Sequence, residues 1–272
     1  MGIQAAMDRV TGAATIVEAL RAADDLAFEA GRDPGVRTLR VLSAALSGDD
    51  DIAAIAAVHA LSEMFDEQAA ARLVSLLDDP RPYIHEHAAW ALGQGLPRFS
   101  ALARLIALVE RGGFTGMLAQ RTLEKWSVAA GDVLAVALES VLAVSAQSTD
   151  AAGRARLVET LGLVRQSSAT RTLLTIARTD TEAVEVREAA VAALGQRSGE
   201  PGVRRALEDL VAADGPLSDH ARLAVIDLEP ALAHTTRDTS SGLTVAQLFL
   251  HADIDPSLSA AGAGDNGGGA TP

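Results

Sequence analysis

A short motif that ends in Ala-Leu-Gly or a close relative of it returns at regular intervals along this chain. Clear copies are WALG at residues 90–93, ETLG at 159–162 and AALG at 192–195, and weaker copies fall near residues 60–62, 123–126 and 227–229. The glycines of the clear copies are 69 and 33 residues apart, so the first interval is close to two copies of the second. A fixed period of this length predicts a fold of stacked repeats, in which each unit contacts only its neighbours.

The composition indicates that these repeats are helical. Alanine accounts for 55 of the 272 residues and aromatic residues for only 3%. Alanine has the highest helix propensity, and apolar residues recur at helical spacing between Thr15 and His234, broken by short Asp, Gly, Pro and Ser clusters. The predicted fold class is therefore all-α, a right-handed α-solenoid of about six helical hairpins. We expect an N-terminal arm at 1–14, the solenoid at 15–234, and at 235–272 a non-repeat tail or linker, or the start of a further domain.

The clearest hairpin begins at Asp79-Pro80. Proline suits the first turn of a helix and aspartate can cap it, and we expect Gly93 to break this helix. A second apolar stripe follows between Pro97 and Gly112. The other predicted hairpins pair residues 16–30 with 36–46, 52–65 with 67–77, 117–127 with 133–144, 154–163 with 169–178, and 180–195 with 201–213, before a last helix at 217–228.

Two of these segments carry a family resemblance. Residues 79–94 (DPRPYIHEHAAWALGQ) and 180–196 (DTEAVEVREAAVAALGQ) resemble HEAT repeats, most of all the short HEAT-like type of phycobilin lyases. The resemblance covers roughly residues 30–230. In that pattern an arginine follows the valine, and here it is Arg187 in one unit but His85 in the other. We therefore expect no continuous arginine–aspartate ladder.

The C-terminal segment has a different pattern. Residues 240–254 are apolar with β-branched side chains, and residues 262–272 are rich in glycine. An apolar strand followed by a glycine loop is typical of nucleotide-binding α/β domains. The segment resembles the first strand and glycine loop of GT-B glycosyltransferases, which implies that Gly267 and Gly268 would lie beside a sugar-nucleotide cleft. The alternative is a disordered tail of glycine, alanine and serine.

Charge and composition restrict the function. The net charge of −13 argues against nucleic acid as a partner, because binding to a phosphate backbone needs a basic surface. The absence of cysteine excludes disulfides and thiolate chemistry. No secretory signal is evident in residues 1–10 and no apolar stretch is judged long enough to span a membrane, so we expect a cytoplasmic protein. Arginine outnumbers lysine 22 to 1, which we attribute to codon usage.

Candidate catalytic and metal-binding groups are sparse. His85 and His87 are two residues apart and would point to different sides of a helix, so they do not predict a metal site. The acidic pairs at 24–25, 49–51 and 78–79 are interpreted as helix caps. We predict no metal, no cofactor and no catalytic residues. Trp90 is expected to pack in the core, and Trp126 to be partly exposed.

The second helices of the hairpins would line the concave face of a HEAT-like solenoid. Polar residues recur on them and predict a groove of mixed charge for a protein or peptide partner. This set contains Arg72, Arg104, Glu110, Glu139, Arg171, Arg178, Arg204, Arg205 and Glu208. The residues that we predict to contact the partner are Arg72, Arg104, Trp126, Arg171, Arg178, Arg204 and Arg205.

The sequence thus leads to three functional hypotheses. The first is a non-catalytic scaffold or adaptor that binds another protein on its concave face, so that the chain is not expected to be an enzyme. The second is an N-terminal regulatory or docking module of a GT-B glycosyltransferase. The third is a lyase-associated HEAT-like protein.

Overall fold

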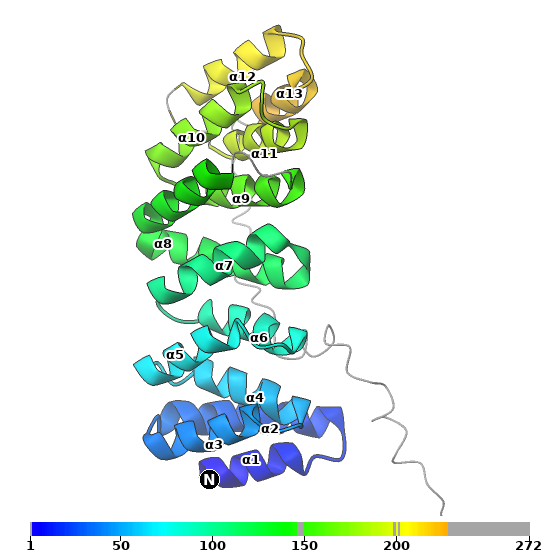
Figure 1. Cartoon of the computed structure of the whole chain (residues 1–272). Helices are drawn as coiled ribbons and strands as arrows, with labels where there is room; N and C mark the ends of the chain where they lie inside the picture. Colours follow the sequence, from blue (N-terminus) through cyan, green and yellow to red (C-terminus); the bar gives the residue numbers. More distant parts are fainter. Residues whose placement is uncertain (1, 146–149, 198–199, 201, 228–272) are drawn as a thin grey trace, which may run out of the picture. The chain divides into compact units, whose positions relative to one another are not determined.

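The computed structural model describes residues 2–145, 150–197, 200 and 202–227, and the regular secondary structure in these residues is α-helical (Figure 1). They fall into two compact units, and the division comes after His87, inside α6 (Pro82–Leu92). Each unit is a stack of antiparallel helical hairpins. This is the architecture of an α-solenoid, so the predicted fold class is confirmed.

The first unit is built around α4. Its helices are α1 (Ile3–Thr11), α2 (Ile16–Arg32), α3 (Val36–Leu46), α4 (Asp51–Ser62), α5 (Glu67–Leu76) and the start of α6. Helices α2, α3 and α5 all pack against α4, and every α4 residue from Ala53 to Ser62 is buried. The segment that the sequence analysis names an N-terminal arm contains α1, which packs against α2 through Ile3, Ala6, Met7 and Val10.

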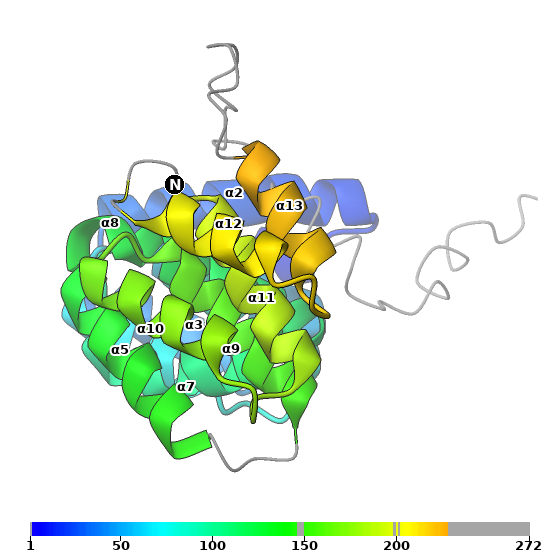
Figure 2. The same cartoon turned by 90° about the horizontal axis from the view of Figure 1, so that it is seen from above.

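The second unit continues from α6 through seven further helices, drawn from cyan-green to orange in Figure 1. They are α7 (Phe99–Arg111), α8 (Gly113–Val144), α9 (Ala151–Leu163), α10 (Ser167–Arg178), α11 (Val184–Gly195), α12 (Val203–Ala212) and α13 (Ser218–Asp227), whose C-terminal members are seen from above in Figure 2. Helix α9 packs against α11 and α11 against α13, so the first helices of successive hairpins are in direct contact. These bounds agree with the predicted hairpins to within a few residues.

Helix α8 differs from the prediction of two separate helices at 117–127 and 133–144. It runs without a loop, and the chain turns at one non-helical residue, Ala130 (φ −139°, ψ 31°).

Among the described residues, α8 is also the one helix long and apolar enough to span a membrane by length and composition. The sequence analysis had judged that no stretch reached that length. The kink at Ala130 and the packing of α8 on α7 and α9 fit a helix of a folded stack.

Aspartates cap several helices: Asp50 lies in a cluster that was predicted to do so, whereas Asp66 and Asp150 were not singled out in the sequence. The Asp50 carboxylate accepts from Ala53 N, Asp66 from Gln68 N and Ala69 N, and Asp150 from Gly153 N. Such caps satisfy amides that have no partner within the helix. The prediction is wrong for Asp24 and Asp25, which lie inside α2, where Asp25 forms an ion pair with Arg9 of α1.

The glycines of the repeated motif lie at close contacts between successive hairpins. A Cβ atom would lie 2.7 Å from Thr122 Oγ1 if added to Gly93, 2.6 Å from Ala193 Cβ if added to Gly162, and 3.0 Å from Ala224 Cβ if added to Gly195. None of the three has a positive φ. Helix α6 does end before Gly93, but what requires glycine here is the neighbouring helix and not a left-handed C-cap.

Five arginines join helices by donating to the carbonyls at the C-terminal end of an earlier helix. Arg197 is the most connected, with Nη2 3.1 Å from both Leu161 O and Gly162 O. The other four donate to carbonyls near the ends of α3, α7, α8 and α10, and these four are, in the same order, Arg81, Arg156, Arg154 and Arg187. Four of the five also pair with a carboxylate: Asp79, Glu182, Asp180 and Glu200. As predicted, these pairs do not form a continuous Arg–Asp ladder.

Two buried histidines of the first unit contact each other. His59 of α4 and His87 of α6 are 3% and 1% exposed, and His59 Nε2 lies 3.1 Å from His87 Nδ1. Burial lowers the pKa of His87 to about 4, and burial followed by the proximity of His87 lowers the pKa of His59 well below its usual value. Both rings are therefore neutral at pH 7. The sequence pattern gives no sign of this pair, because the two histidines are 28 residues apart and belong to different hairpins.

We predict that Gly162→Ala destabilises the second unit by about 1–3 kcal/mol, because the new methyl group overpacks against Ala193. At an open helical position the same change would stabilise the protein by up to about 1 kcal/mol. Both tryptophans, Trp90 and Trp126, belong to this unit, so their fluorescence during urea unfolding measures the effect. The matched control is Gly215→Ala, where a Cβ meets nothing within 4 Å. Gly162→Ala combined with Ala193→Gly should recover stability, and a failure to recover would contradict the close-contact explanation.

The histidine pair predicts that the first unit loses stability as the pH falls. The folded pKa of His87 lies below its unfolded value of 6.5, so the unfolded chain binds more protons between pH 6.5 and about 4. The loss should approach about 1.4 kcal/mol per pH unit for one such group. Hydrogen exchange of the α4 amides from pH 7.5 to 5 measures it. His59→Leu combined with His87→Leu should flatten the dependence, whereas His220→Asn, at an exposed position, should leave it unchanged.

Candidate functional site

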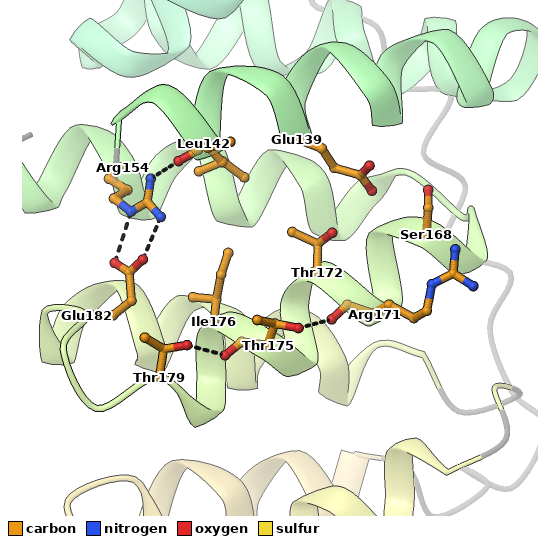
Figure 3. Close-up of a pocket in the computed structure, with 11 residues that line it drawn as sticks. Glu139, Leu142, Arg154, Ser168, Arg171, Thr172, Thr175, Ile176, Thr179 and Glu182 are labelled. Carbon is orange, nitrogen blue, oxygen red and sulfur yellow. Dashed lines mark hydrogen bonds and ion pairs between the residues drawn. The ribbon is translucent and has the colours of Figure 1, made fainter. Parts of the chain in front are cut away.

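The second unit contains an open groove of about 420 Å³ between the C-terminal half of α8 and α10 (Figure 3). Arg154 at the start of α9 and Glu182 before α11 close one end of it. The remaining lining comes from one face of each of the two helices. These residues are Glu139, Leu142 and Ala143 of α8, and Ser168, Arg171, Thr172, Thr175, Ile176 and Thr179 of α10.

The charges at the closed end of the groove are neutralised. Arg154 Nε lies 3.0 Å from Glu182 Oε2 and its Nη2 2.6 Å from Glu182 Oε1, in a two-pronged ion pair. Arg154 Nη1 also donates to Leu142 O and to Ser145 Oγ. The two side chains are only 6% and 14% exposed. This end therefore holds α8, α9 and the α10–α11 loop together.

The charges at the opposite end have no partner in the described part of the chain. Glu139 Oε1 is inaccessible to solvent and accepts no hydrogen bond. Arg171 is exposed, and no described carboxylate pairs with its guanidinium. In Figure 3 the Glu139 side chain projects into the groove from α8, and Arg171 extends from α10 on the side of Ser168. Buried acceptors almost always have a donor. Because Glu139 as a whole is only half-buried, a turn of its side chain toward the open groove would bring Oε1 within reach of a donor from outside.

Hydroxyl groups line the α10 side of the groove. Ser168, Thr172, Thr175 and Thr179 follow a spacing of four, three and four residues, which places them on one face of the helix. Thr175 and Thr179 donate to the carbonyls of Arg171 and Thr175 within α10, so their oxygens remain as acceptors. With Leu142 and Ile176 as apolar floor, the groove offers donors, acceptors and both charges along one line. The sequence analysis missed this stripe, although its spacing was visible.

The predicted partner-binding residues differ in location and exposure. Arg171 lines the groove, and Arg104, Arg178, Arg204 and Arg205 are exposed on the second helices α7, α10 and α12. Arg72 is half-buried on α5, in the first unit. The prediction for Trp126 is wrong. Its side chain is only 2% exposed, because it lies on the inward face of α8. Trp126 therefore packs in the core and is unavailable to a partner. Gly267 and Gly268 lie outside the described residues.

No group of three or more metal-ligating side chains occurs in the described ranges. His85, which the sequence analysis weighed as a ligand, lies half-exposed with Nδ1 3.3 Å from Asp79 O. Tyr83 nearby donates to Asp51, and burial together with this hydrogen bond raises its pKa to about 12. This cluster joins α6 to the start of α4.

The comparisons with known proteins identify the repeats. Residues 138–226, which include the groove, match the family model for HEAT repeats. No curated protein matches the chain. A solved structure of human deoxyhypusine hydroxylase in complex with glycerol is similar at 18% identity and a TM-score of 0.36, covering 84% of this chain and 96% of that one. This comparison overturns the expectation that the chain is not an enzyme, since a similar helical-repeat chain is a hydroxylase.

We predict that Arg154→Met destabilises the second unit by about 3 kcal/mol. The substitution leaves the largely buried Glu182 carboxylate and the Leu142 carbonyl without their donor. Urea unfolding followed by tryptophan fluorescence measures the change. Arg154→Met combined with Glu182→Met should cost less than the single change, because no unpaired charge remains. Arg178→Met, at an exposed position on α10, should change stability by less than about 0.5 kcal/mol. An equal cost for both arginines would contradict this role of Arg154.

Proposed function

We propose that this HEAT-repeat chain is a scaffold that binds a partner protein through the second helices of its second unit, with the groove between α8 and α10 at the centre. The observation that carries the proposal is the Glu139 carboxylate, whose Oε1 is buried without a hydrogen bond at the wall of an open groove. A buried acceptor of this kind costs free energy unless a donor reaches it. A partner that supplies the donor, after the Glu139 side chain turns Oε1 into the groove, recovers that free energy on binding.

The charges around the groove support a protein partner. Arg171 at the rim is the counterpart of Glu139, so a partner segment with a basic and an acidic side chain would meet complementary charges on both walls. The α10 hydroxyls can hydrogen-bond polar side chains or main-chain groups that line up along the helix. Arg178 on the same helix and Arg204 and Arg205 on α12 extend the exposed positive charge over neighbouring second helices. The net charge of −13 continues to disfavour nucleic acid.

The alternative role as a docking module of a GT-B glycosyltransferase depends on residues 235–272. These lie outside the described residues, so that hypothesis stays a prediction of the sequence analysis, as does the lyase-associated role. The groove supports partner binding whichever larger assembly contains the chain.

A quantitative pull-down with the full chain tests the proposal. We expect Arg171→Glu with Arg205→Glu, and separately Glu139→Gln, to reduce recovery of the specifically bound protein by about tenfold, because charge pairs at the centre of an interface are lost or reversed. Each variant is compared with wild type at equal bait concentration, and its helical content is checked by circular dichroism.

The matched control is Arg121→Glu, which reverses an exposed arginine on the first half of α8, away from the groove lining. It should recover as much partner as wild type does. Unchanged recovery by both groove variants would overturn the proposed function. An equal loss in the Arg121 variant would show that only net charge matters.

A further inference from the structure

We infer that the element of the partner that docks here is an amphipathic helix with lysine or arginine along the flank that faces α8, and that its apolar side covers an outward-facing row of valines on α8. The inference rests on the proposed function and names the kind of partner. The row, called the valine face below, consists of Val133, Val136 and Val144, which are 45%, 62% and 85% exposed. Large apolar side chains that gather on one exposed helix face are typical of interaction sites.

The valine face is a single stripe in the C-terminal half of α8. Val133, Val136 and Val144 are separated by three and eight residues, which brings them to the same side of a helix. Ser140 occupies the gap between them, and its hydroxyl donates to Val136 O at 2.7 Å. The one polar side chain in the stripe is thus turned back to the main chain. The opposite side of α8 is buried through Leu134, Leu138 and Leu142, so this half-helix is apolar on both sides.

The valine face continues directly into the groove. At 100° per residue, Ala143 and Glu139 of the groove wall lie next to Val136 around the helix. A helix laid along α8 would therefore contact the valines with its apolar side and present its flanking residues to Glu139. Helices bind in this manner through anchors spaced three, four and seven residues apart.

The charge of α8 determines the chemistry of that flank. Residues 131–144 contain Asp132 and Glu139 and neither lysine nor arginine. Glu139 therefore selects a lysine or arginine at the edge of the partner's apolar side. The same charges disfavour a membrane surface, because interfacial helices carry lysine and arginine on their polar side. The segment after the kink is also shorter than the roughly 20 residues that span a bilayer.

Binding of two labelled synthetic peptides to the full chain tests the inference. Both peptides are amphipathic helices with the same leucine face and glutamine on the rest of the polar side, one with lysines and one with glutamates along one edge of the leucine face, and fluorescence anisotropy measures the Kd. We expect the lysine peptide to bind at least about tenfold more tightly. Val136→Ser with Val144→Ser, and separately Glu139→Gln, should each weaken it about tenfold. Val36→Ser is the matched control, since Val36 is 68% exposed in the first unit.

Three results would overturn the inference. The first is equal affinity for the two peptides, and the second is unchanged affinity of the valine double variant for the lysine peptide. The third is binding of the wild-type chain to phosphatidylcholine vesicles that is lost in the valine double variant, which would assign the face to a membrane. If the groove variants lose the natural partner in the pull-down while the valine double variant keeps it, this inference fails and the proposed function stands.

Discussion

Successive first helices of the second unit approach so closely that only hydrogen fits at the contact. Gly162 faces Ala193 at a separation that leaves no room for a Cβ atom on the glycine, and Gly195 faces Ala224 at one where a Cβ atom would be tightly crowded. Because main chains meet directly there, small differences in side-chain volume determine how the hairpins stack. The alanine-rich composition has the same origin, since bulky side chains on the inner faces would hold these helices apart.

Arginine complements the close packing at the helix ends. A helix leaves its last carbonyls without internal partners, and in a stack several of them face the next hairpin instead of water. Arg154, Arg156 and Arg197 reach across and donate to such carbonyls. The guanidinium group supplies five donors in a plane, whereas an ammonium group is a point charge. Codon usage alone is therefore an incomplete explanation for the scarcity of lysine.

The sequence was sufficient to predict the helices, because helical periodicity and capping are local properties. Asp50 caps the helix that its position indicated. The errors concern contacts between hairpins. Trp126 was expected to be partly exposed, and the contact of His59 with His87, which lies 28 positions later in the next hairpin but only 3.1 Å away, was not predicted. Which side chains meet across hairpins depends on the rotation of each helix about its axis, and the apolar pattern leaves that angle loosely defined.

The groove illustrates the same limit. Glu139 and Arg171 were both recognised as polar residues of second helices, yet their proximity around one cavity depends on how α8 is set after its kink at Ala130. The α10 hydroxyl stripe was readable from spacing alone, but serine and threonine at helix positions are common enough to pass unnoticed.

The arginine contacts also bear on how the second unit comes apart. Repeat arrays can fray one repeat at a time, because each repeat depends only on its neighbours. Here Arg197, located after α11, holds the end of α9, and Arg154 at the start of α9 holds the end of α8. Removing the last hairpin therefore breaks hydrogen bonds two helices away in the chain as well as apolar contacts. Such bonds couple the opening of adjacent hairpins. We therefore expect the hairpins of this unit to open together as one cooperative unit, and not independently of one another.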